Sequence, residues 1–175
     1  MNVPNFITLI RVVLIPFFVN LMIYGYYREA LMVFVAACVT DALDGLIARM
    51  TQTKTELGAF LDPAADKLLI VSSFVTLVLL GKLPVWLVII VVSRDVILTL
   101  GSLVIYFTLH ELKVQPSLAG KLTTLLQFVV VTLSLVLMNF GSELGLMVFL
   151  QWTTAAVTIL SGMQYVMRGM KLVGK

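Results

Sequence analysis

The sequence predicts an all-α integral membrane protein, a bundle of six transmembrane helices with a polar cleft at its cytoplasmic side. Of its 175 residues, 61% are hydrophobic and only 12% are charged. The mean hydropathy of +1.09 is far above that of a soluble domain. Six apolar segments are each close to the length of about 20 residues that a transmembrane helix needs. The four glutamates lie between these segments or, for Glu29, at the start of one, whereas all five aspartates lie within them or at their ends.

The predicted spans leave little chain for a soluble domain, so residues 1–175 are expected to form a single transmembrane domain. The first apolar run lacks a basic amino-terminal region and carries Arg11 in its middle. This pattern predicts a retained helix rather than a cleaved signal peptide. The six spans cover roughly residues 4–26, 28–49, 60–81, 84–109, 117–139 and 144–166.

The first span carries a polar edge. Asn5, Thr8 and Arg11 recur at i+3 spacing in the run PNFITLIRVV, so they share one side of a helix. This edge could line the cleft and contact a substrate, or support a residue that does. The alternative is a purely structural pairing of Arg11.

The second and third spans each present an acidic face. At about 100° per residue, two carboxylates and two very small residues of the second helix fall within one arc: Asp41, Asp44, Gly45 and Ala48. The third helix presents a similar arc: Gly58, Asp62, Ala65 and Asp66. Pro63 is tolerated there if it lies in the first turn. The short connection predicts antiparallel neighbours whose acidic faces meet in one cleft.

The fourth and fifth spans also carry charged residues. Arg94 and Asp95 are immediate neighbours in VVSRDVIL, so their side chains leave the helix about 100° apart and are not expected to satisfy each other. Arg94 is therefore a candidate for binding an anionic substrate. Lys121 opens the fifth helix, where it could contact phosphate or simply anchor the helix end at the interface.

The basic residues predict the orientation. Seven of them lie on the side that holds both termini, against only Arg28 and Lys82 on the other side. Because cytoplasmic loops carry an excess of Lys and Arg, both termini are expected in the cytoplasm. The net charge of +3 reflects this bias, and no nucleic acid partner is expected.

Four carboxylates in one membrane region need compensation. Each costs about 2.5–3.5 kcal/mol near the bilayer centre, so the four together cost about 10 kcal/mol. Crowded acids escape repulsion by taking up protons or by binding cations. Two divalent ions would neutralise four charges, and hard oxygen ligands suit Mg²⁺ or Mn²⁺. Arg49 adds a positive fork suited to phosphate, so the set fits a diphosphate that bridges two metals.

The motif D-x-x-D-G-x-x-A-R, eight residues, then G-x-x-x-D-x-x-x-D resembles the signature of the CDP-alcohol phosphatidyltransferases at every specified position. The likeness in predicted architecture covers essentially the whole chain. It implies a membrane enzyme that transfers a phosphatidyl group from CDP-diacylglycerol to an alcohol and releases CMP, with two divalent cations, Mg²⁺ or Mn²⁺, as cofactors. It also implies a homodimer, which we expect in a bacterial inner membrane.

The same resemblance assigns roles to the motif. Asp66 would act as the general base on the acceptor hydroxyl, and such proton removal contributes about 10²- to 10⁴-fold to the rate. The implied metal ligands are Asp41, Asp44, Asp62 and Asp66. The implied CDP-binding residues are Asp44, Gly45, Ala48, Arg49, Gly58 and Asp62.

The acceptor is expected to be anionic, because Arg94 with Lys54 or Lys121 forms a cationic set. Glycerol-3-phosphate, inositol phosphate and phosphatidylglycerol remain open. The P-N-x-x-T-x-x-R opening resembles both phosphatidylglycerophosphate and cardiolipin synthases. The chain as a whole, including LGAFLDPAADKLL, resembles phosphatidylglycerophosphate synthases, whose acceptor glycerol-3-phosphate is the preferred expectation. Those enzymes usually carry Glu and Arg where this chain has Asp95 and Ser102. The run S-R-D-V is closer to cardiolipin synthases, whose acceptor is phosphatidylglycerol.

Two other classes use intramembrane carboxylates. Membrane prenyltransferases bind diphosphates through aspartates and Mg²⁺, although the A-R, eight residues and Gly between the acidic pairs argue against that class. Cation transporters also place carboxylates within the bilayer. A transporter would have no need for Arg49 beside the acidic face.

Overall fold

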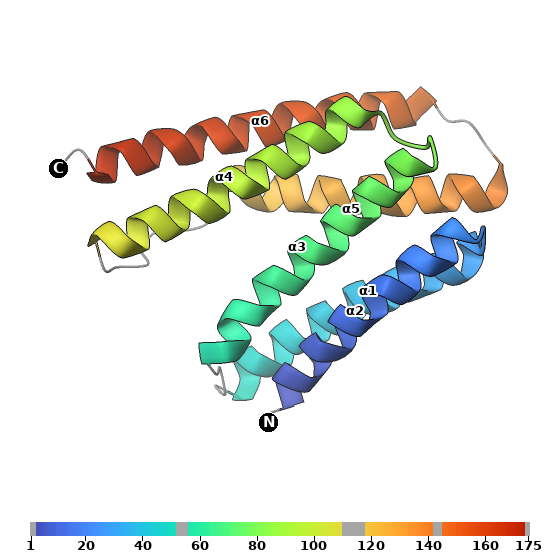
Figure 1. The fold of residues 1–175 in the computed structure, drawn as a ribbon, viewed down its shortest axis with the longest axis horizontal. Helices are drawn as coiled ribbons and strands as arrows, with labels where there is room; N and C mark the ends of the chain where they lie inside the picture. The colour runs from blue at the N-terminus through green and yellow to red at the C-terminus, as the bar shows by residue number, and fades with distance from the viewer. Residues whose placement is uncertain (1–2, 52–55, 110–117, 142–144, 174–175) are drawn as a thin grey trace. The chain divides into compact units, whose positions relative to one another are not determined.

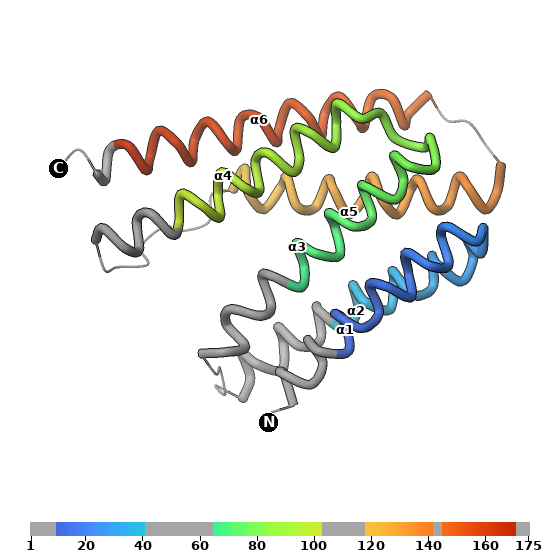
Figure 2. Tube along the Cα trace, in the orientation of Figure 1, coloured from blue at the N-terminus to red at the C-terminus, as the bar shows by residue number. Residues whose placement is uncertain are grey.

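The computed structural model describes the backbone of residues 3–51, 56–109, 118–141 and 145–173, and the side chains of residues 10–40, 65–102, 118–141 and 145–170, the coloured trace in Figure 2. Over this part of the chain, all regular structure is α-helical (Figure 1). The helices are α1 (Val3–Ile23), α2 (Tyr27–Thr51), α3 (Glu56–Leu79), α4 (Val85–Leu109), α5 (Leu118–Phe140) and α6 (Gly145–Val173). The all-α prediction is confirmed, and each predicted span corresponds to one helix.

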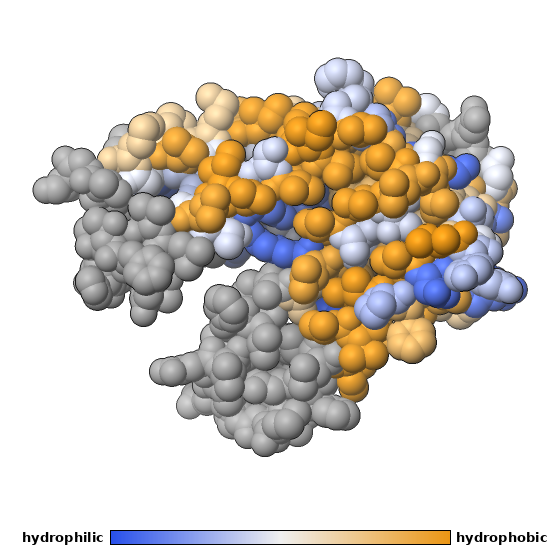
Figure 3. Space-filling model, in the orientation of Figure 1, coloured by the Kyte–Doolittle hydropathy of each residue, from blue (hydrophilic) through white to orange (hydrophobic). Residues whose placement is uncertain are grey.

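Three helices in the described part of the chain are long and apolar enough to cross a membrane. The qualifying stretches are Val85–Ser102 in α4, Leu118–Phe140 in α5 and Gly145–Met170 in α6. Large apolar side chains are also exposed: Phe17, for example, is 61% exposed. Figure 3 shows apolar residues covering the visible outer faces of α4 and α6. Such surfaces suit acyl chains rather than water, as in a membrane protein.

The chain forms two compact units, of which the first comprises Met1–Lys82 and Val131–Ser142. Within it, α1 packs against both α2 and α3. The rings of Phe18 on α1 and Phe34 on α2 lie 5.7 Å apart between centroids, tilted by 43°, which is a favourable aromatic geometry. The two helices that carry the acidic motif are thus held by a common neighbour.

Helices α1 and α3 end in the same hydrogen-bonding pattern. At the end of α1, the N–H of Gly25 donates to the carbonyl of Met22 at 3.3 Å, and the N–H of Tyr26 donates to Leu21 at 2.9 Å. Gly25 has a φ of +82° there, and Gly81 after α3 has a φ of +68°. Such left-handed glycines close the last turn and satisfy carbonyls that would otherwise lack donors. Both helices therefore stop sharply.

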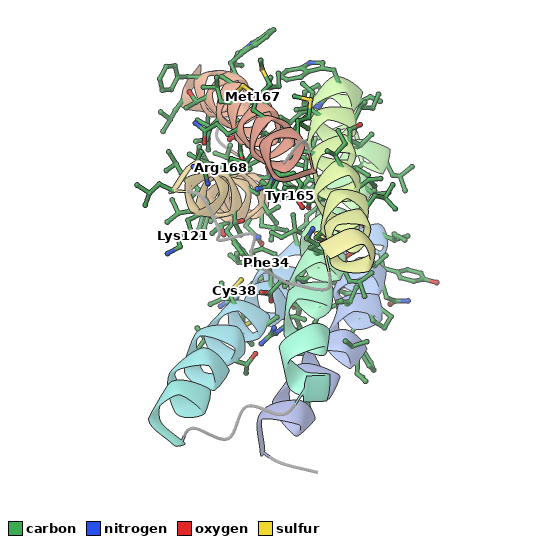
Figure 4. All side chains as sticks on the ribbon, turned by 90° about the vertical axis from the view of Figure 1, so that its left-hand side faces the viewer. Phe34, Cys38, Lys121, Tyr165, Met167 and Arg168 are labelled. Carbon is green, nitrogen blue, oxygen red and sulfur yellow. The ribbon has the colours of Figure 1, made fainter. Side chains whose placement is uncertain are left out.

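The second unit comprises Leu83–Val130 and Glu143–Lys175, and in it α4 packs along α6. The rings of Trp86 and Trp152 lie 4.8 Å apart between centroids. Further along both helices, a Cβ built on Gly101 would lie only 2.8 Å from the Tyr165 ring, which points toward α4 in Figure 4. The second contact lies C-terminal to the first on both helices, so α4 and α6 run parallel. A side chain at residue 101 would therefore require the Tyr165 ring to shift.

One detail of the predicted third helix is wrong. The helix was expected to start near residue 60 with Pro63 in its first turn, but α3 begins at Glu56 and Pro63 lies in its interior. Proline there removes one backbone donor. Membrane helices tolerate such residues, because neighbouring groups can satisfy the freed carbonyl.

Candidate active site

The acidic motif lies on α2 and α3. Asp41 and Asp44 are three residues apart on α2, and Asp62 and Asp66 are four residues apart on α3. Residues with these separations share one side of a helix. Because only residues 52–55 join the helices, the end of α2 and the start of α3 lie within about 18 Å of each other. The backbone provides the helical spacing that two acidic faces require.

Asp66 is the motif residue whose carboxylate the structure describes, and Arg11 binds it. The Arg11 Nη1 donates to the Asp66 Oδ1 at 2.8 Å, across 55 positions of the sequence. The Arg11 side chain is completely buried, whereas the Asp66 side chain is 34% exposed. The ion pair compensates the buried guanidinium, since an unpaired charge is costly to bury. It also leaves the carboxylate partly accessible and links the polar edge of α1 to the acidic motif.

Several predicted site residues have side chains outside the described part of the chain. These are Asp41, Asp44, Gly45, Ala48 and Arg49 on α2, Gly58 and Asp62 on α3, and Asn5 and Thr8 on α1. Lys54 lies between α2 and α3, outside the described residues altogether. Their roles stay predictions.

The donor set fits a pair of divalent cations. Four carboxylates on two connected helices supply hard oxygen ligands of the kind that Mg²⁺ and Mn²⁺ prefer. The Asp66 side chain is partly exposed, so its neighbours do not enclose it completely. The residues that could hold the cations are Asp41, Asp44, Asp62 and Asp66.

A second polar centre lies between α4 and α6. The Arg94 Nη1 donates to the Asp95 Oδ1 at 2.8 Å, and its Nη2 donates to the Ser161 Oγ at 3.0 Å. The expectation that Arg94 and Asp95 do not satisfy each other is therefore wrong. It considered only the directions in which the two side chains leave the helix. The long arginine side chain bends back far enough to reach its neighbour.

Ser161 was not among the predicted site residues, although the sequence of α6 carries a signal for it. Three hydroxyl residues of α6 are buried at helical spacing, Thr154, Thr158 and Ser161. A polar stripe within an apolar span marks the face that turns toward protein rather than lipid. Lys121 lies near the start of α5, as predicted, and its side chain is exposed (Figure 4). Its role stays a prediction.

The model of one protein family, described as CDP-alcohol phosphatidyltransferase, matches residues 1–160. The chain belongs to this family. The resemblance drawn from the acidic motif is confirmed, and the protein is an enzyme, a transferase that takes CDP-alcohol substrates. Transferases of this family generally depend on divalent cations.

Relatives of this CDP-alcohol phosphatidyltransferase carry two kinds of name. The chain is 34% identical over 180 residues to a Mycobacterium tuberculosis H37Rv protein named "Probable phosphatidylglycerophosphate synthase", and the match covers 99% of this chain and 84% of that protein. It is 33% identical to the CDP-diacylglycerol–glycerol-3-phosphate 3-phosphatidyltransferase of Bacillus subtilis, covering 94% and 93%. It is also 33% identical to the human cardiolipin synthase (CMP-forming), covering 89% of this chain and 58% of that protein.

Proposed function

We propose that this protein transfers the phosphatidyl group of CDP-diacylglycerol to glycerol-3-phosphate and releases CMP. The observation that carries the proposal is the ion pair between Arg11 and Asp66. It joins the PNFITLIR opening, which resembles phosphatidylglycerophosphate and cardiolipin synthases, to the acidic motif of the whole family. The near full-length similarity to bacterial relatives with that named activity supports the same acceptor.

The proposal includes the setting of the enzyme. Residues 1–175 form one catalytic domain with six transmembrane helices in a bacterial inner membrane, both termini lie in the cytoplasm, and the enzyme acts as a homodimer. The excess of basic residues on the side of the termini supports the orientation. The polar cleft then opens at the cytoplasmic side, where a nucleotide arrives from water and a lipid from the bilayer.

The acidic motif would hold two divalent cations through Asp41, Asp44, Asp62 and Asp66. When bound, the cations supply charge compensation for the diphosphate and for the departing CMP. Gly45, Ala48 and Gly58 have room for cytidine diphosphate because they carry little or no side chain. Arg49, Asp44 and Asp62 complete the CDP site.

Asp66 acts as the general base on the acceptor hydroxyl. A neutral alcohol is a poor nucleophile, so accepting its proton while the oxygen attacks phosphorus lowers the barrier. The Arg11 Nη1 donates to the Asp66 Oδ1 at 2.8 Å, and the Asp66 side chain is partly exposed, which leaves a side from which a hydroxyl can approach. The buried guanidinium thereby fixes the direction from which the base acts.

Arg94 is the residue that we propose to bind the acceptor phosphate. Lys54, Lys121, Asn5 and Thr8 stay candidates for contacting the acceptor or supporting a residue that does. Arg94 lies between two helices with its head held in place, which suits it to a specific anion site. Lys121 is exposed and suits a guiding role at the rim.

Phosphatidylglycerol is the second candidate acceptor, and one observation favours it. Asp95 compensates the charge of Arg94 at 2.8 Å, and the Ser102 hydroxyl donates to the Thr99 carbonyl and adds no positive charge. A phosphodiester carries one negative charge, so it needs less compensation than a phosphomonoester. The similarity to the human cardiolipin synthase agrees with this alternative.

An acceptor panel tests the proposal. The purified full chain receives CDP-diacylglycerol, Mg²⁺ and one acceptor at a time: glycerol-3-phosphate, phosphatidylglycerol, inositol phosphate or serine. We expect CMP release with glycerol-3-phosphate. Release with phosphatidylglycerol alone would replace the proposed acceptor by the second candidate, and no release with any acceptor would overturn the transferase assignment for these substrates.

A further inference from the structure

Arg94 is tethered by two different helices. Its Nη1 donates to Asp95 on its own helix and its Nη2 donates to Ser161 on α6, at 2.8 and 3.0 Å. The side chain of Arg94 is only 11% exposed. A planar guanidinium that is held at two of its three nitrogens cannot rotate freely, so the directions of its remaining N–H groups are set.

We propose that Ser161 is a positioning residue, which orients the Arg94 guanidinium toward the phosphate of a glycerol-bearing acceptor. This inference rests on the proposed function, in which Arg94 binds that phosphate. Ser161 itself is 2% exposed, so it acts through Arg94.

The donors of Arg94 leave room for such a ligand. A guanidinium carries five N–H groups, and Asp95 and Ser161 each accept one of them. Nη1 and Nη2 therefore each keep a second N–H, whereas the Nε is buried and has no hydrogen-bond partner among the residues that the structure describes. A phosphate oxygen pair can accept two parallel bonds from one arginine. An anion at Arg94 would therefore use donors that α4 and α6 leave available.

Helix α6 supports the stem of Arg94 as well as its head. A Cβ built on Gly162 would lie 3.6 Å from the Arg94 Cγ, at ordinary van der Waals distance. The arginine stem thus lies over a position with no side chain, directly beside the serine that receives its head. On α6, Gly162 thus lies beside the aliphatic part of the Arg94 side chain, and Ser161 accepts a hydrogen bond from its guanidinium.

The other buried hydroxyls of α6 bond differently. Thr158 donates to the Thr154 carbonyl at 2.6 Å, and Thr154 donates to the Leu150 carbonyl at 2.7 Å. Both bonds stay within the helix, as is usual for hydroxyls in membrane helices. Ser161 instead accepts from a charged group on another helix. Thr158 therefore provides a matched control, since it is equally buried one turn away.

The test compares Ser161→Ala, Ser161→Thr and Thr158→Val with the wild-type full chain. For each we would measure KM and kcat, and also equilibrium binding of two probes, soluble glycerol-3-phosphate and phosphatidylglycerol in mixed micelles. We expect Ser161→Ala to raise the KM and Kd of the true acceptor about tenfold, the size of one hydrogen bond to a charged group. The KM for CDP-diacylglycerol should stay within about twofold. Ser161→Thr, which keeps the oxygen, should restore acceptor binding, and Thr158→Val should match the wild type.

The binding readout separates this inference from the proposed function. A wild-type protein that binds an acceptor but releases no CMP would overturn the function, while the Ser161 comparison would still be decided by Kd. Unchanged acceptor affinity in Ser161→Ala, or wild-type protein that binds neither probe, would overturn the positioning role. Ser161→Ala could also weaken the binding of both substrates equally and lower Tm. That result would show a purely structural effect and would overturn the positioning role. The probe whose affinity depends on Ser161 identifies the source of the phosphate.

Discussion

Asp66→Asn should lower kcat about 10²- to 10⁴-fold, the range that a positioned general base contributes. The amide of asparagine cannot accept the hydroxyl proton, but its oxygen can still accept the bond that Arg11 Nη1 makes to Oδ1. Folding and CDP-diacylglycerol affinity should therefore change little. The measurement is steady-state CMP release at saturating substrates, together with Tm.

The control for this variant is Glu29→Gln, which makes the same chemical change at an exposed acid in the first turn of α2. It should leave kcat unchanged. If Asp66→Asn retained more than about a tenth of the wild-type kcat, Asp66 would not be the base.

Arg11→Gln should lower kcat about 10²-fold, because the Asp66 carboxylate loses the group that holds its orientation. It should also lower Tm. Breaking a fully buried ion pair costs about 3–5 kcal/mol, and about 1–3 kcal/mol is expected here because the Asp66 side chain is 34% exposed and partly screened by solvent. The measurement is kcat, KM for both substrates and Tm on the same preparation.

Two further variants decide how Arg11 acts. Lysine keeps the positive charge and can still donate the single hydrogen bond that Arg11 makes to Asp66. Arg11→Lys should therefore recover much of kcat. Arg28→Gln, at an exposed arginine of the same compact unit, should leave kcat and stability unchanged. A kcat of wild-type size in Arg11→Gln with a lowered Tm would show that Arg11 serves only the packing of α1 against α3.

The order and type of the helices could be predicted because long apolar runs determine them. The predicted boundaries fail where a helix extends past its apolar run: α3 begins four residues early, at Glu56, and α6 continues through a polar tail to Val173. Once a helix is nucleated, each further residue adds a hydrogen bond, so polar residues can extend it. Hydropathy alone does not mark such ends.

The acidic motif could be found because eight specified residues stand at fixed spacing on two predicted helices. The partners of the charged residues could not be found in the same way. Arg11 and Asp66 are 55 positions apart, and only the packing of α1 on α3 brings them together. The pair of Arg94 and Asp95 was missed because the reach of a long side chain exceeds what helical angles suggest. Ser161 is uncharged and does not stand out in the sequence. Its hydrogen bond with Arg94 is seen only once α4 packs beside α6.

Metal binding between α2 and α3 is the claim on which the proposed chemistry most depends, and anomalous scattering tests it directly. Crystals of the full chain would be grown with Mn²⁺ and cytidine diphosphate, and data would be collected at the manganese edge. We expect two peaks roughly 3.5–4 Å apart, the spacing of two-metal sites, ligated by the carboxylates of Asp41, Asp44, Asp62 and Asp66. Carboxylates that point away from one another, with no peak between the two helices, would contradict it.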